Sequence, residues 1–196
     1  MITLPNYPGP QALSVSLVDF GTVQLGALGG TAQRINRLGA RWRVEVQLPP
    51  MTTAEARVWA AALTRGLREG VSWKLRQVGT PTGSPGAVLV NGANQAGGSL
   101  IVDGGTAGYV AKAGQWLSIL TGGRRYLHQL AATTQLSGTG TGTLQIEPLL
   151  RVSPADNAPV ELGAPVIEGL LSTPPGWSID AGRLVRGLSF AIEEMA

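Results

Sequence analysis

One stretch, residues 41–59, constrains the fold more than any other part of this chain. From residue 41 to residue 48, apolar and polar side chains alternate strictly. The apolar positions are Trp42, Val44, Val46 and Leu48. A period of two is typical of a strand with one buried and one solvated face, as in most antiparallel sheets. The stretch therefore predicts a half-buried β-strand in an antiparallel sheet.

A helix is predicted directly after this strand. Pro49 and Pro50 cannot donate ladder hydrogen bonds, so the strand ends there. Thr52 followed by Glu55 has the spacing of a capping box, and Gly70 suits a helix C-terminus. We therefore expect a helix at residues 53–69. Apolar residues at helical spacing predict its buried face, namely Ala56, Trp59, Ala60, Leu63 and Leu67.

The composition favours a folded, mainly β protein. The chain has 196 residues, of which 43% are hydrophobic and 14% charged, and this is enough apolar surface for a core. The 28 Gly and 13 Pro predict many turns. The absence of cysteine excludes disulfides and thiolate metal sites. Neither an export signal nor a membrane span is expected, because no basic segment precedes a long apolar run.

The order of short apolar segments predicts two units. Residues 13–17, 22–25 and 71–78 read as strands that accompany the strand and helix above, with a turn at residues 26–30. Residues 79–86 are rich in Gly and Pro and have the composition of a connector. Four further strand candidates follow between glycine-rich turns, without a helix among them. They are residues 100–103, 115–120, 125–132 and 143–147.

The last third of the chain returns to longer apolar strands. Residues 164–171, 177–179 and 188–192 are extended, and a lone C-terminal strand must join a sheet to bury its apolar face. We therefore expect residues 1–82 and 163–196 to form one β domain with the helix on its flank. Residues 83–162 are expected to form a small β-barrel inserted into that domain.

The sequence offers no convincing catalytic constellation. His128 is the only histidine and lacks the spacing motifs of a metal or base site, so we expect a structural or interface role. The acids Glu168, Glu193 and Glu194 are expected to be exposed or salt-bridged. The glycine-rich segments lack the Lys-Ser or Lys-Thr of a phosphate loop and are expected to be turns. We predict no catalytic residue, no cofactor, no metal site and no enzymatic activity.

The net charge is too small to indicate a dedicated nucleic-acid binder, since 15 Lys and Arg stand against 12 Asp and Glu, giving +3. Arg124 and Arg125 next to Tyr126, together with Trp116, have the residue types of a barrel surface that binds single strands. For the two aromatic side chains we expect instead a place in the core of a small barrel or beside each other in a hairpin. The arginine pair equally fits a channel lumen or a neighbouring subunit.

Several segments resemble a family of small tail proteins encoded by long-tailed bacteriophages and prophages of proteobacteria. One is residues 28–51 with the start of the helix at residues 54–59. The others are residues 123–128, 149–156 and 164–169. Together they lie within residues 28–194 and are mostly apolar rather than catalytic. The organisation is similar to that of the distal tail proteins of siphovirus tail tips.

The resemblance implies a fold and a role. The fold is a tail-tube-like β-sandwich with one flanking helix and an inserted barrel of the OB type. The role is that of a structural virion protein that forms a hexameric ring between the tail tube protein and the tail hub or baseplate protein. Such a ring surrounds the channel through which phage DNA passes. The implied location is the tail tip of the virion, assembled in the host cytoplasm, with no membrane involved.

These expectations define the candidate residues and the alternatives. We expect residues 21–39 to engage an adjacent protomer, and Arg34, Arg37, Arg41 and Arg43 to face an interface or the lumen. An exposed face of the sheet accounts for these four arginines about as well. Arg124 and Arg125 are further candidates for such contacts. The alternatives are a carbohydrate-binding adsorption module that acts through the barrel, and a nucleic-acid-binding barrel protein whose affinity falls steeply with salt.

Overall fold

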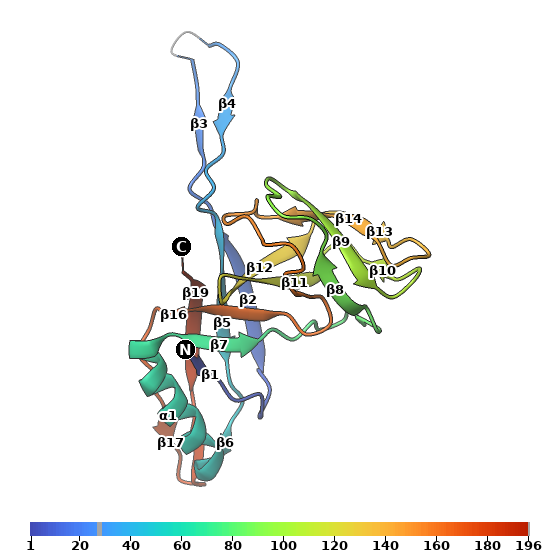
Figure 1. Cartoon of the computed structure of the whole chain (residues 1–196). Coiled ribbons are helices and arrows are strands. Elements are labelled where there is room, and N and C mark those ends of the chain that lie inside the picture. Colours follow the sequence, from blue (N-terminus) through green and yellow to red (C-terminus); the bar gives the residue numbers. More distant parts are fainter. Residues whose placement is uncertain (27–28, 196) are drawn as a thin grey trace.

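The computed structural model describes residues 1–26 and 29–195 and confirms a mainly β fold with one helix. A mixed six-stranded sheet and a nearly closed six-stranded antiparallel barrel lie side by side, and a hairpin projects away from both (Figure 1). The turn predicted at residues 26–30 includes Ala27 and Leu28, which lie outside the described residues.

The six-stranded sheet draws its strands from both ends of the chain. Its order is β1-β7-β16-β19-β5-β2, and all neighbours are antiparallel except β1 and β7. The strands are β1 (Ile2–Thr3), β2 (Ala12–Val18), β5 (Arg41–Gln47), β7 (Val71–Lys74), β16 (Val166–Leu171) and β19 (Ser189–Glu194). The C-terminal strand thus lies inside this sheet, between β16 and β5.

Strand β5 shows the alternation that the sequence predicts. Val44, Val46 and Leu48 are almost fully buried, while Glu45 and Gln47 on the other face are exposed. The neighbouring strand β19 pairs in register, with Ile192 opposite Val44. Directly opposed residues of an antiparallel pair project to the same side, so the two apolar rows form one continuous face. The core of the sheet lies on that face.

Helix α1 (Thr53–Glu69) covers this apolar face and begins at the predicted capping box. Glu55 N donates to the Thr52 hydroxyl, and the Glu55 carboxylate accepts from Thr52 N. Trp59 packs against Phe190 of β19 with ring centroids 5.6 Å apart. Gly70 ends the helix with φ of 73° and donates its N–H to the carbonyl of Gly66.

The prediction of the buried helix face is wrong for one residue, Leu67. Ala56, Trp59 and Leu63 are buried as expected, but Leu67 is 38% exposed and Gly66 is buried in its place. At 100° per residue, Gly66 and Leu67 each lie 20° outside the stripe that Ala56, Trp59 and Leu63 define, on opposite sides of it, so the helical pattern does not decide between them. A Cβ at Gly66 would meet Val71 Cγ1 at 2.3 Å, so the helix approaches β7 too closely there for any side chain.

The barrel is built from residues between β7 and β16. Its strand order is β15-β11-β12-β14-β9-β8, and the bridge between Leu89 and Pro159 joins the two ends. The strands are β8 (Gly86–Val90), β9 (Ser99–Gly105), β11 (Trp116–Thr121), β12 (Arg124–Leu130), β14 (Gly142–Glu147) and β15 (Val160–Glu161). It has an apolar core separate from that of the sheet, which includes Leu100, Leu117 and Leu144.

Three small sheets complete the fold. Strands β10 (Val110–Ala111) and β13 (Thr134–Gln135) pair beside the barrel. Strands β17 (Ser178–Ile179), β18 (Leu184–Arg186) and β6 (Met51–Thr52) form a three-stranded sheet near the start of α1. Strands β3 (Thr22–Gln24) and β4 (Gln33–Ile35) form the projecting hairpin.

Candidate functional site

The projecting hairpin is the most unusual surface of the molecule. We call residues 19–26 and 29–40 the arm. It connects β2 to β5 and extends beyond the sheet and the barrel (Figure 1). Several of its large apolar side chains face solvent. They are Phe20 at 44% exposure, Val23 at 54%, Leu25 at 76%, Ile35 at 36% and Leu38 at 57%.

The root of the arm is held by local polar contacts. Asp19 accepts a hydrogen bond from Gly21 N at 2.9 Å and forms an ion pair with Arg34 of β4. Arg34 also donates through Nε to the side chain of Asn36 at 3.1 Å. The guanidinium of Arg41 lies 5.0 Å from the centroid of the Phe20 ring. These contacts fix the direction in which the arm leaves the sheet.

Beyond its root, the arm has no packing partner within the described chain. Both β3 and β4 are exposed along their whole length. An isolated two-stranded ribbon in water is at best marginally stable, because it buries too little apolar surface to offset its conformational entropy. An arm of this kind is therefore expected to gain order from a surface outside its own chain.

The strand that leads into the arm is also open. β2 is an edge of the six-stranded sheet and pairs only with β5 among the described residues. Its sequence, Ala-Leu-Ser-Val-Ser-Leu-Val, contains neither a charge nor a proline. Proteins usually protect an exposed edge with such residues, since unpaired N–H and C=O groups recruit other strands. β2 therefore remains competent to accept a further strand.

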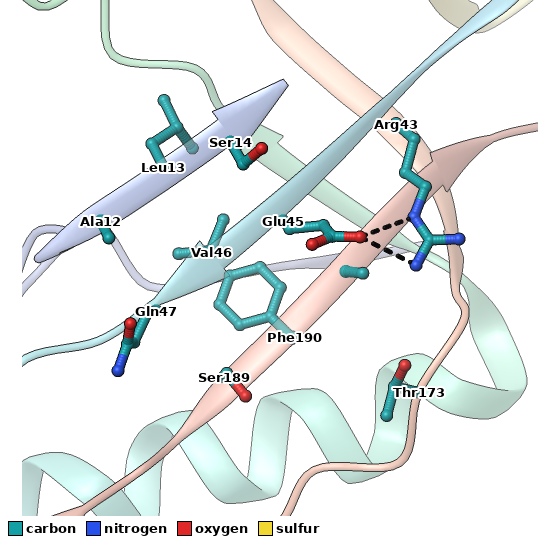
Figure 2. Close-up of a pocket in the computed structure, with 11 residues that line it drawn as sticks. Ala12, Leu13, Ser14, Arg43, Glu45, Val46, Gln47, Thr173, Ser189 and Phe190 are labelled. Atoms are coloured by element: carbon teal, nitrogen blue, oxygen red, sulfur yellow. Dashed lines mark hydrogen bonds and ion pairs between the residues drawn. The ribbon is translucent and has the colours of Figure 1, made fainter. Parts of the chain in front are cut away.

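A shallow groove with a volume of ≈ 530 Å³ lies on the outer face of the sheet, where β2, β5 and β19 meet (Figure 2). Its charged side chains are Arg43 and Glu45, whose ion pair measures 3.0 Å. Ser14, Gln47 and Ser189 also line it. Apolar side chains, among them Leu13 and Phe190, line the rest of the groove, so it is mixed in character, its two charges balance, and it adjoins the open β2 edge.

The predicted arginines fall into two groups. Arg34, Arg37, Arg41 and Arg43 follow one another from the arm onto the outer face of the sheet. Arg34 and Arg37 are exposed, whereas Arg41 is half-buried and donates to Glu193 at 2.6 Å. Arg124 begins β12 and is exposed. The second group consists of Arg124 and Arg125, and of these two only Arg125 forms ion pairs within the chain.

Arg125 belongs to a polar junction between the barrel and the sheet. Its Nε donates to Glu161 at 2.9 Å, and its Nη1 donates to Glu168 at 2.9 Å. Hydrogen bonding to Glu161 is the main cause that raises the pKa of Arg125, and burial opposes it. The Ser118 hydroxyl donates to Glu161 at 2.5 Å and accepts from Val166 N. These contacts join β11, β12 and β15 of the barrel to β16 of the sheet.

A second buried ion pair lies in the same junction. Arg151 Nη2 is 2.9 Å from Glu194 Oε1, and the side chains are only 6% and 1% exposed. Glu194 also accepts from Leu127 N at 2.7 Å and from Trp42 N at 2.8 Å. Burial raises the pKa of Glu194, while Arg151 and the two N–H groups act in the opposite direction.

His128 is buried and hydrogen-bonded within its own chain. It is 1% exposed, and its Nδ1–H donates to the carbonyl of Pro148 at 2.8 Å. Burial lowers the pKa of His128 to about 4, the hydrogen bond opposes this, and the charge of Arg151 adds to it. The imidazole is therefore neutral at physiological pH. Among the described residues, no three His, Cys, Asp or Glu side chains gather as a metal site.

The barrel aromatics make internal contacts. Trp116 meets Trp42 of the sheet edge-on, with centroids 4.7 Å apart, and so belongs to the junction. The Tyr126 ring lies 5.1 Å below the guanidinium of Arg151. The Tyr109 hydroxyl donates to the carbonyl of Thr82 at 2.8 Å. All three side chains are half-buried. Neither Trp116 nor Tyr126 belongs to the apolar core of the barrel, so the barrel-core expectation is wrong for both, and Trp116 packs against the core of the sheet instead.

Sequence reasoning missed the role of Glu194. It treated Glu193 and Glu194 as equivalent acids, yet Glu193 pairs with Arg41 and is half-buried, whereas Glu194 is 3% exposed. The signal was present, because Leu188, Phe190 and Ile192 alternate on the apolar face and residue 194 continues that series. A carboxylate at such a position must find buried partners.

No protein-family model matches this chain, and a search of curated proteins finds no similar sequence. In the part of the chain that the structure describes, no helix has the length and hydropathy needed to span a membrane.

Proposed function

We propose that this protein is a structural, ring-forming component of a phage tail tip that joins the tail tube protein to the hub or baseplate protein. In this proposal, several copies, six by the family resemblance, surround the channel through which the phage DNA passes. The proteins act in the virion, after assembly in the host cytoplasm. No catalytic step is assigned to the chain.

The observation that carries this proposal is the arm. It exposes Val23, Leu25 and Ile35 on a two-stranded ribbon whose strands are both exposed along their whole length. Exposed apolar side chains on a projecting element are typical of a surface that another molecule covers. A chain with such an arm is built to be part of an assembly.

A second copy of the chain is the partner that we propose for the arm. The open β2 edge continues directly into the arm, so each copy offers both a projecting element and an unpaired strand edge. When one surface patch binds a different patch on the next copy, the contact is heterologous, and it closes into a ring if the rotation allows it. The arm and the β2 edge supply two such patches.

The arginines of the arm give a direct test. In the double variant Arg34→Glu and Arg37→Glu, two exposed charges are reversed at the root of the arm. We expect the variant to remain folded, because exposed ion pairs contribute only about 0–1 kcal/mol to stability. We expect it to lose ring assembly, measured as mass by light scattering, alone and on mixing with the tube and hub proteins.

A matched control separates the arm from a general charge effect. Arg57→Glu and Arg68→Glu reverse two exposed charges on α1. This variant should assemble as the parent does. If the arm variant assembles normally, or if the parent chain stays monomeric with both partner proteins, the proposed function is wrong.

The barrel gives no observation that favours the carbohydrate-binding or nucleic-acid-binding alternative. Its half-buried aromatics contact other parts of the chain, and Arg125 is held by two carboxylates. Glycan or single-stranded DNA binding by a monomer in the same mixing experiment would nevertheless support those functions instead.

A further inference from the structure

The barrel is open along part of one seam, beside strand β12. β12 pairs with β11 from Arg124 to Gln129, but it pairs with β14 only at Gln129 and Leu130. Backbone N–H groups of successive residues in a strand point to opposite sides. The N–H groups of Arg125 and Leu127 therefore point to the side where β14 has already diverged.

Two carboxylates of the six-stranded sheet fill this gap. Glu168 Oε2 of β16 accepts from Arg125 N at 3.0 Å, and Glu194 Oε1 of β19 accepts from Leu127 N at 2.7 Å. They bond N–H groups two residues apart on one side of β12, where a neighbouring strand would supply carbonyls. Side chains of one sheet thus complete the hydrogen bonding of the other.

The same carboxylates bind the two units together. The second oxygen of Glu194 accepts from Trp42 N of β5, and Arg151 neutralises the charge of Glu194 from the barrel side. Glu168 holds both the backbone and the guanidinium of Arg125. The junction has an apolar part as well: Leu127 of β12 is fully buried in the core cluster of the sheet, and Trp116 of β11 packs against that cluster and meets Trp42 edge-on.

Each unit has a core of its own. The cluster around Trp59, Trp73 and Phe190 lies between the sheet and α1, whereas the cluster around Leu100 and Leu144 lies inside the barrel. The chain crosses between the units twice, near residues 75–85 and 162–165. Apart from Leu127 of β12, which is buried in the core cluster of the sheet, the two cores are separate, so the units are expected to move relative to each other when the contacts between them open.

We propose that Glu168 and Glu194 form a latch that fixes the barrel on the sheet, and that opening this latch lets the barrel reorient as an intact body. The latch consists of the two carboxylates and of the Arg125 and Leu127 N–H groups that they bond. It is a conformational device of the single chain, so it does not depend on the proposed ring.

The test is the double variant Glu168→Gln and Glu194→Gln, which keeps the side-chain size but removes both negative charges and one acceptor from each group. Glu193→Gln is the matched control, because Glu193 is adjacent in sequence but pairs with Arg41 instead. The chain has no cysteine, so Ile101→Cys in the barrel and Arg57→Cys on α1 give two unique spin-label sites on exposed residues.

Pulsed electron paramagnetic resonance then measures the distance between the two labels. We expect one narrow distribution for the parent and for the control, and a distribution at least about twofold broader for the double variant. Circular dichroism should show that the double variant keeps its β structure. An unchanged narrow distribution would overturn the latch, and so would a variant that loses its β structure, because the units would then not survive separation.

Discussion

The arm and the junction use the same kinds of side chain in opposite ways. In the junction, Arg151 and Glu194 form an ion pair whose side chains are 6% and 1% exposed. In the arm, Arg34 and Asp19 form an ion pair whose side chains are 61% and 35% exposed. The junction also buries Trp42 and Leu127, while the arm leaves Leu25 and Leu38 in solvent.

This difference separates contacts within the chain from contacts that we propose between chains. A buried charge is tolerated only where partners replace its water, and Glu194 has a cation and two N–H donors. In the described residues, the charged and apolar groups of the arm remain largely exposed to solvent. In our proposal, a second copy of the chain covers the exposed apolar groups of the arm.

The largest expected effect is the loss of stability when the ion pair of the junction, rather than that of the arm, is removed. Arg151→Met leaves Glu194 buried without its cation and is expected to lower the free energy of unfolding by about 3–5 kcal/mol. Arg34→Met removes the exposed pair of the arm and is expected to cost about 0–1 kcal/mol. Urea denaturation followed by circular dichroism measures both. Equal losses for the two variants would contradict the distinction between the arm and the junction.

The next largest effect is the pH dependence of stability that the buried His128 causes. Unfolded His128 is expected to titrate near pH 6.5, whereas in the folded chain its pKa is about 4. Between these values, the unfolded state binds a proton that the folded state does not, so stability falls as the pH falls from 6.5 to 4. The expected loss from this residue is about 3 kcal/mol over that interval.

The variant His128→Gln isolates this contribution, since an amide still donates to the Pro148 carbonyl but does not titrate. Its stability is expected to depend less steeply on pH between 6.5 and 4 than that of the parent. Denaturation curves at a series of pH values give the two slopes. The same slope in both proteins would mean that His128 is not a buried neutral group.

The smallest effect on stability belongs to the apolar side chains of the arm. Val23→Ser together with Leu25→Ser removes two exposed apolar groups, and the unfolding free energy of the monomer is expected to change by less than about 0.5 kcal/mol. Assembly should nevertheless weaken, because those groups are proposed to be covered by the next copy. A large loss of monomer stability would show that the arm packs on its own chain.

Much of the local structure could be predicted from residue patterns. The strand through Val44 and Val46, the capping box of Thr52 and Glu55, and the helix end at Gly70 all follow from short-range rules. Strand β8 was not anticipated, because its sequence, Gly-Ala-Val-Leu-Val, contains no polar side chain and so shows no alternation. Leu67 was misplaced because the helix meets β7 through Gly66, a contact that no helical pattern reveals.

The sequence by itself determined a mainly β chain with one capped helix, since hydrophobic period and capping residues act over a few positions. The alternation of β19 places Glu194 on the buried face, but only the tertiary structure decided which partners the internal charged residues find. Leu127 and Glu194 are 67 positions apart, and their hydrogen bond exists because sheet and barrel meet at β12. The sequence gives no reason to distinguish Arg34 from Arg125. In the structure, Arg34 lies exposed on the arm, whereas Arg125 pairs with two carboxylates. Burial of a charge depends on long-range packing, so it is settled only when distant strands come together.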